Sequence, residues 1–212
     1  PKILKDEKYG EEARKLYEDA QTYLSEMAQE GSIVPKGKIG FFAAESEGDD
    51  ILLYSNDERS APSAKLCMLR NQRLMEQSPN RSLADFIAPK GEKDYMGAFI
   101  VTAGHGVEKL CAKYEKENDD YAIIMIKSLA DRLAEAFAEY AHERVRKELW
   151  GYAPTERLEN DELIKEKYQG IRPAPGYAAC PDHTEKRKLF KLLNGEEIGV
   201  QLTESCAMNP AA

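Results

Sequence analysis

One short segment concentrates the residues that could do chemistry. Residues 172–183 read RPAPGYAACPDH and hold three prolines and one glycine. Each proline fixes φ at about −65° and removes a backbone donor, whereas Gly176 permits a turn or the close approach of a ligand. Such a stiff, irregular segment loses little conformational entropy when it binds. The segment is therefore a candidate binding loop.

Two side chains of this segment suit an organic ligand. The guanidinium of Arg172 can hold a carboxylate through two hydrogen bonds, and Tyr177 offers a flat face with a hydroxyl. A proline-rich connector with a surface arginine has the same composition. The residue types alone therefore leave both interpretations open.

Other motifs fit a functional site less well. Gly104-His105-Gly106 lacks the rest of a dinucleotide-binding fingerprint and is typical of a turn after a strand. Cys180 and His183 have the spacing of metal ligands, but two further ligands are missing, so we predict no metal site. No side chain is assigned a catalytic role, and His142 fits a structural one. A small basic cluster near a helix end suits the helix dipole, with partner docking as an alternative: Arg144, Arg146 and Lys147.

The loop must be positioned by helices, and the strongest helical pattern covers Asp120–Trp150. This stretch has no glycine or proline, and Gly151 is expected to end it. Its apolar face is predicted to run through Ile126, Leu129, Leu133, Phe137, Tyr140, Arg144 and Leu149. Shorter helices are predicted over Gly10–Ala28, Val107–Tyr114, Asn160–Tyr168 and Thr184–Leu193, the last with capping-box spacing between Asp182 and Glu185.

Strand patterns alternate with these helices without a regular βαβ rhythm. Lys38–Ala44 and Asp50–Tyr54 are predicted to form a hairpin, and further strands are expected over Tyr95–Ala103 and Gly199–Thr203. Two segments stay ambiguous: Lys65–Gln77 (a strand, then a helix or loop) and Ser82–Ile87 (a helix or an edge strand). The mixture predicts an α+β fold with an antiparallel sheet.

Composition limits the class of protein. The chain has 212 residues, a length that suits one domain over residues 1–212. Its net charge of −8 argues against nucleic acid and against an anionic membrane as partners. It has no long apolar run, so no transmembrane helix is expected, and its first residues lack the apolar region that is typical of a signal peptide. Its four cysteines lack a CxxC pair, which indicates a reducing, cytoplasmic location. Both ends are expected to be cut from a longer chain, with natural processing as the alternative.

The segment Tyr168–Tyr177, with its continuation to Lys186, resembles the RxxxGY signature region of the activation domains of cobalamin-dependent methionine synthases. The resemblance runs from about Lys2 to the end, in one order and with few gaps. Its other parts are ADRLAEAFAEY (130–140), HERVRK (142–147), WGYAP (150–154) and, more weakly, GDDI (48–51), DYMGAF (94–99) and LTES (202–205).

The resemblance implies a fold and a function. In this family a C-shaped single domain surrounds a twisted antiparallel sheet with long helices. Methionine synthase moves a methyl group from methyltetrahydrofolate to homocysteine through cobalamin, whose cob(I)alamin form is occasionally oxidised to inactive cob(II)alamin. The activation domain then supplies S-adenosylmethionine and a flavodoxin-like reductase supplies an electron, which restores methylcobalamin. The implied partners are the cobalamin-binding module of the same enzyme and the reductase; the chain alone is not expected to make methionine.

The resemblance also implies a set of S-adenosylmethionine-binding residues. Arg172 would hold the carboxylate, while the backbone of Pro173, Ala174 and Gly176 would face the adenine. Tyr177 would lie beside the ligand or the corrin. Two acidic side chains match positions that the family places near the ligand, where a carboxylate favours the sulfonium cation, although each also suits a solvated surface: Glu135 and Glu166.

The chain departs from the family pattern in two ways. Ala178 stands where many members have a proline, and the N- and C-terminal segments with further ligand contacts are absent from this sequence, so we expect an incomplete site. Two alternatives remain: a stand-alone module that senses S-adenosylmethionine or docks a corrinoid protein without chemistry, and a purely structural interaction domain.

Overall fold

The computed structural model of the protein describes residues 2–74 and 78–210. The described residues cluster into two compact units. Unit 1 combines the described residues up to Lys36 with Val101–Glu139 and the residues from Asn209 onward, and unit 2 combines Gly37–Ile100 with Tyr140–Met208. Among the described residues, no helix is both long and apolar enough to cross a membrane.

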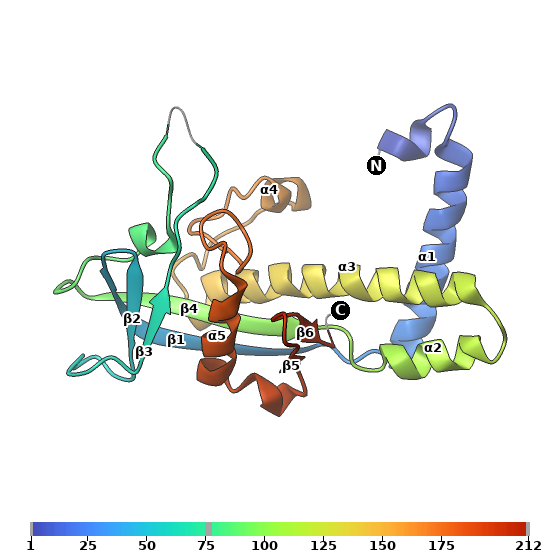
Figure 1. Ribbon diagram of the computed structural model, residues 1–212. Coiled ribbons are helices and arrows are strands. Elements are labelled where there is room, and N and C mark those ends of the chain that lie inside the picture. The colour runs from blue at the N-terminus through green and yellow to red at the C-terminus, as the bar shows by residue number, and fades with distance from the viewer. Residues whose placement is uncertain (1, 75–77, 211–212) are drawn as a thin grey trace. The chain divides into compact units, whose positions relative to one another are not determined.

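Unit 1 is built from helices α1 (Gly10–Glu30) and α2 (Val107–Glu115) and most of α3 (Asp120–Arg144) (Figure 1). Gly31 ends α1 in the left-handed conformation, and its N–H donates to the carbonyl of Met27, which satisfies one of the last free carbonyls. The apolar faces of the helices meet in one core, formed by Met27, Leu110, Cys111, Met125, Ile126 and Leu129.

Unit 2 carries a four-stranded sheet in the order β3-β2-β1-β4 (Figure 1). Its strands are β1 (Lys36–Glu47), β2 (Asp50–Tyr54), β3 (Ala64–Cys67) and β4 (Asp94–Thr102). β1 and β2 form a tight antiparallel hairpin that pairs Glu47 with Asp50, and β2 pairs antiparallel with β3. One face of the sheet buries a core of Ala44, Ile51, Leu53, Leu66, Met68, Ala84 and Cys180.

The elements after the sheet complete unit 2. α3 runs on into a π-helical turn, Val145–Leu149, and is followed by the short α4 (Asn160–Ile164) and by α5 (Lys186–Leu193). β5 (Gln201–Leu202) and β6 (Met208–Asn209) pair as a small ribbon. Short 3-10 turns cover Lys2–Lys5, Leu83–Phe86, His183–Glu185 and Gly195–Ile198.

The predicted α+β class and the antiparallel sheet are confirmed, but several boundaries differ. The helix predicted over Asn160–Tyr168 ends at Ile164, because Glu166 adopts a left-handed φ of 53°. The last predicted strand is reduced to Gln201–Leu202. Of the ambiguous segment, Ala64–Cys67 is a strand and residues 68–74 are irregular, while residues 75–77 lie outside the described part.

The start of α5 also differs from its prediction. The α-helix begins at Lys186, after a 3-10 turn, and Asp182 caps that turn by accepting from the N–H of Thr184. The predicted capping box is wrong: the carboxylate of Glu185 accepts instead from the N–H of Cys67 and from Lys188.

The predicted apolar face of the long helix fails at its C-terminal end. Tyr140 is 52% exposed and Leu149 is 49% exposed. The buried positions there are Ala141, His142, Val145 and Arg146. The predicted single domain over residues 1–212 and its C shape stay predictions.

Candidate functional site

The candidate loop is held in place by hydrogen bonds of its own backbone. The N–H of Gly176 donates to the carbonyl of Cys180 (2.9 Å), and the N–H of Tyr177 donates to the carbonyl of Ala174 (3.1 Å). Cys180 in turn donates to the carbonyl of Tyr177 (3.0 Å). Because Cys180 is buried in the core beneath the sheet, the loop is fixed to the rigid part of unit 2.

Position 176 strongly favours glycine. Its φ is +105°, a region that L-residues rarely adopt, and a Cβ there would lie 2.3 Å from Cε1 of His183. The tight turn therefore brings the loop backbone directly against the His183 ring. It leaves Tyr177 projecting with 70% of its surface exposed, while Arg172 and Pro173 are half-buried and Ala174 is exposed.

The segment before the loop contributes Tyr168 to a largely buried group of four residues, here called the anchoring cluster: His142, Arg146, Glu156 and Tyr168. The guanidinium of Arg146 is fully buried. Its Nε lies 3.0 Å from both carboxylate oxygens of Glu156, and its Nη2 lies 2.7 Å from Oε1. The guanidinium lies over the Tyr168 ring at 4.4 Å, and His142 meets the same ring edge-on at 4.8 Å.

His142 is neutral at physiological pH. Burial, and then the positive charges of Arg146 and Arg172, lower its pKa to about 4. Its Nδ1 lies 2.8 Å from Nη1 of Arg146, and since arginine can only donate, the imidazole proton must sit on Nε2. Because the charge of Arg172 helps to lower the pKa of His142, this charge lies within electrostatic range of the cluster.

A known protein family matches the whole chain. The family described as "Vitamin B12 dependent methionine synthase, activation domain" matches residues 1–212. The chain belongs to this family. Its suspected resemblance to the activation domains is thereby confirmed over the full sequence.

A solved structure is similar to this activation domain throughout. It is the crystal structure of the MetH reactivation domain bound to AdoHcy, with 52% sequence identity and a TM-score of 0.93. The match covers 99% of this chain and 66% of the solved chain, so this chain spans just under two thirds of that protein's length.

The two acidic candidates of the activation domain lie on exposed surface. Glu135 forms an ion pair with Arg132 at 2.8 Å on α3, within unit 1. Glu166 is exposed at the left-handed position after α4, within unit 2, two residues before Tyr168. Arg172, Pro173, Ala174, Gly176 and Tyr177 lie together in one loop of unit 2. A site shared by the loop and the two carboxylates stays a prediction.

Two other sequence motifs of the activation domain are explained by packing. The Cys180 thiol donates to the carbonyl of Ala174 at 3.0 Å, and burial raises its pKa. Within residues 2–74 and 78–210, no three His, Cys, Asp or Glu side chains are grouped to hold a metal ion. Arg146, one member of the predicted basic cluster, is fully buried and forms an ion pair with Glu156. It therefore does not belong to a basic surface.

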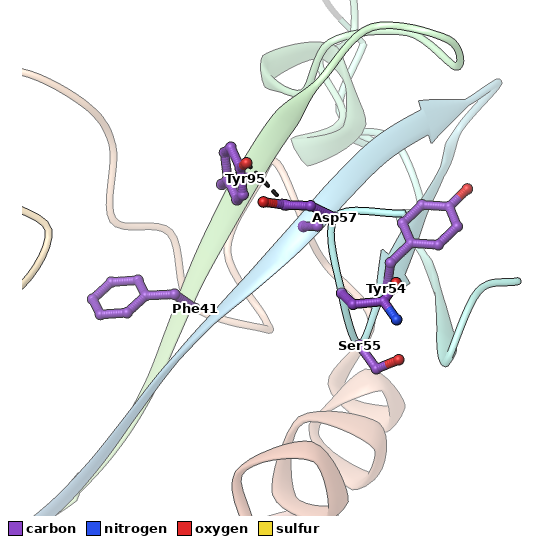
Figure 2. A pocket seen from close by; sticks show the side chains of 7 residues that line it. Phe41, Tyr54, Ser55, Asp57 and Tyr95 are labelled. Carbon is purple, nitrogen blue, oxygen red and sulfur yellow. Dashed lines mark hydrogen bonds between the residues drawn. The ribbon is translucent and has the colours of Figure 1, made fainter. Parts of the chain in front are cut away.

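A separate pocket of about 290 Å³ opens at the sheet of the activation domain (Figure 2). Figure 2 shows Tyr95 donating its hydroxyl to Asp57 Oδ1 at 2.9 Å. The lining residues are Phe41, Ala43, Tyr54, Ser55, Asn56, Asp57 and Tyr95. They come from β1, β2, β4 and the turn after β2, so no single sequence motif could have identified them.

Proposed function

We propose that this chain is the S-adenosylmethionine-binding reactivation module of cobalamin-dependent methionine synthase, a methyltransferase. In this role it presents S-adenosylmethionine for the reductive methylation of cob(II)alamin to methylcobalamin. The observation that carries the proposal is the 52% identity, over 99% of this chain, to a reactivation domain bound to AdoHcy. AdoHcy, S-adenosylhomocysteine, is what S-adenosylmethionine becomes once its methyl group has been transferred.

The loop suits the amino acid and adenine ends of this ligand. Arg172 is half-buried as a residue, and its guanidinium can hold a carboxylate with two charge-assisted hydrogen bonds. Pro173, Ala174 and Gly176 would meet the adenine with their backbone, which the internal hydrogen bonds of the loop already fix. A fixed backbone has little freedom left to lose on binding.

The reacting end of the ligand needs negative charge and a partner. Glu135 and Glu166 are the carboxylates proposed to favour the sulfonium. The exposed ring of Tyr177 is proposed to lie beside the ligand or the corrin. Cobalamin, bound mainly by another module of the same enzyme, supplies the cobalt that accepts the methyl group.

The partners follow from the balance of the reaction. Transfer of a methyl cation from sulfur to cobalt needs one electron to begin from cob(II)alamin, and a flavodoxin-like reductase is the proposed donor. No nucleic acid or membrane takes part, and a cytoplasmic location is proposed. Three of the four free cysteines are buried, which suits a reducing compartment.

The test uses the complete enzyme that carries this chain. S-Adenosylmethionine is titrated by calorimetry, and the conversion of cob(II)alamin to methylcobalamin is followed by absorbance with a chemical or flavodoxin electron donor. We expect binding, and conversion that requires both S-adenosylmethionine and the donor. A folded enzyme that neither binds S-adenosylmethionine nor converts cob(II)alamin would contradict the proposal.

A further inference from the structure

The anchoring cluster has a composition that stability alone does not require. A buried arginine and glutamate gain in attraction little more than they lose in hydration, and well-packed apolar residues often replace such a pair without loss of stability. Arg146 is nevertheless fully buried, with its guanidinium divided among a carboxylate, an imidazole and an aromatic ring. Such directional contacts fix geometry more narrowly than apolar packing does.

The geometry that the cluster fixes is that of the residues just before the loop. Tyr168, whose ring packs against both His142 and Arg146, is four residues before Arg172. The next residue, Gln169, accepts a hydrogen bond on its carbonyl from the Tyr152 hydroxyl at 3.2 Å. At Gly170, with φ at +95°, an added Cβ would lie 2.9 Å from the same hydroxyl.

Tyr168 and Gln169 are thus held by contacts, and the Tyr152 hydroxyl leaves no room for a side chain at Gly170. Ile171 alone separates Gly170 from Arg172. These contacts limit the movement of the backbone before Arg172. At the other end of the loop, the hydrogen bond from Gly176 to the buried Cys180 limits it in the same way. The charge of Arg172 lies within electrostatic range of His142. The contacts of Tyr168 and Gln169 are therefore the means by which the cluster can act on Arg172.

We propose that Tyr168 and Arg146 of the anchoring cluster, together with Tyr152, are positioning residues that hold Arg172 ready for the carboxylate of S-adenosylmethionine. This inference rests on the proposed function. Tyr152 contacts the segment just before the loop, Tyr168 belongs to that segment, and Arg146 packs against Tyr168, so the three would act through Arg172 and not on the ligand directly.

The experiment measures the S-adenosylmethionine dissociation constant of the complete enzyme and its Tyr168→Leu and Tyr168→Phe variants, with near-UV circular dichroism to confirm folding. Tyr168→Leu removes the ring and is expected to weaken binding about tenfold, since a small displacement of a positioning group is costly. Tyr168→Phe keeps the ring and is expected to bind S-adenosylmethionine as tightly as wild type. Unchanged binding by Tyr168→Leu overturns the inference.

A double-variant cycle separates positioning from a general structural effect. In an Arg172→Ala background, Tyr168→Leu should no longer change the dissociation constant, because the group on which it acts is gone. An equal loss in both backgrounds overturns the inference. If Tyr168→Leu does not fold, Tyr152→Phe takes its place in the same double-variant cycle with Arg172→Ala. It removes only the hydroxyl of a partly exposed tyrosine, and unchanged binding by this variant also overturns the inference.

The two proposals fail in different ways. A folded wild-type enzyme without affinity for S-adenosylmethionine contradicts the proposed function itself. A wild-type enzyme that binds, loses affinity with Arg172→Ala, and is indifferent to Tyr168→Leu and Tyr152→Phe contradicts only the positioning role.

Discussion

At the scale of single residues, Arg172 is the side chain on which the ligand's carboxylate should depend. Replacing Arg172 by Ala removes a charge-assisted hydrogen-bonding partner, and we expect binding of S-adenosylmethionine to weaken by about 1.5–3 kcal/mol, or roughly ten- to a hundredfold in Kd. Calorimetric titration of the complete enzyme measures this loss.

Two controls make the Arg172 prediction specific. Methylthioadenosine lacks the amino acid head, so its affinity should be the same for wild type and Arg172→Ala. Arg157→Ala removes an exposed arginine of the same unit and should leave S-adenosylmethionine binding unchanged. If Arg172→Ala is folded and binds S-adenosylmethionine like wild type, the carboxylate is held elsewhere.

His142 makes a second prediction at this scale, on stability against pH. Its pKa is about 4 in the folded protein and 6.5 for a solvated histidine of the unfolded chain, so between these values the unfolded chain binds more protons. The free energy of unfolding therefore falls as the pH drops from about 6.5 to 4, by on the order of 3 kcal/mol. The groups that face this imidazole are Arg146, Tyr168 and, electrostatically, Arg172.

The measurement is urea unfolding of wild type and His142→Gln at pH 7 and pH 5. Glutamine does not titrate, so the variant should lose less stability than wild type over this interval. Carboxylates contribute equally to both proteins and cancel in the difference. Equal losses in the two proteins would show that His142 is protonated as easily when folded as when unfolded.

The loop residues were predictable from the sequence, whereas the cluster behind them was not. Arg172, Gly176 and Tyr177 stand in one stiff segment whose composition and family resemblance both indicate a site. Arg146 occurs among other charges at a helix end, where cations are ordinarily solvated. Only the tertiary fold brings Glu156 and Tyr168 around it, and no spacing in the sequence records that contact.

At the scale of elements, the turn at Gly176 should be required for the loop's shape. Gly176→Val places a branched side chain at φ +105° and against the His183 ring. Such backbone strain alone costs on the order of 1–3 kcal/mol, and the clash adds to it. We expect weaker S-adenosylmethionine binding and a lower Tm, measured by titration and by thermal unfolding.

A matched glycine separates the two causes. Gly91 has φ +98° but nothing within 4 Å of an added Cβ, so Gly91→Val carries the strain without the clash. It should lower Tm modestly and leave binding intact. Adding His183→Ala to Gly176→Val should recover part of the lost stability. Binding by Gly176→Val equal to that of Gly91→Val would show that the close approach to His183 does not shape the site.

The long helix shows what hydrophobic periodicity can predict and what it cannot. Its existence was predictable because Asp120–Trp150 lacks glycine and proline. Its buried face was not, because the buried side differs between the two ends of the helix. Ile126 is buried in the first half and His142 near the C-terminal end, and at about 100° per residue these two positions lie about 160° apart around the helix axis. The apolar pattern could not predict a buried face that includes a histidine and an arginine.

At the scale of the whole molecule, the α+β class followed from the sequence and the division into two units did not. Each unit joins segments that are far apart along the chain, and such long-range packing leaves no local pattern. The proposed function, likewise, is a property of the complete enzyme, because the chain would serve reactivation while other modules carry out turnover. A variant at the exposed end of the loop should therefore separate the two activities.

Tyr177→Ala provides that separation. The side chain is 70% exposed, so its removal should leave the fold intact, and Tyr17→Ala, at 51% exposure on α1, is the matched control. If Tyr177 lies beside the ligand or the corrin during reactivation, its loss should slow the return of methylcobalamin from cob(II)alamin. Methyl transfer from methyltetrahydrofolate should stay unchanged when oxidation is prevented. Equal losses in both assays would instead place Tyr177 in a role common to every turnover, and unchanged reactivation would remove it from the site.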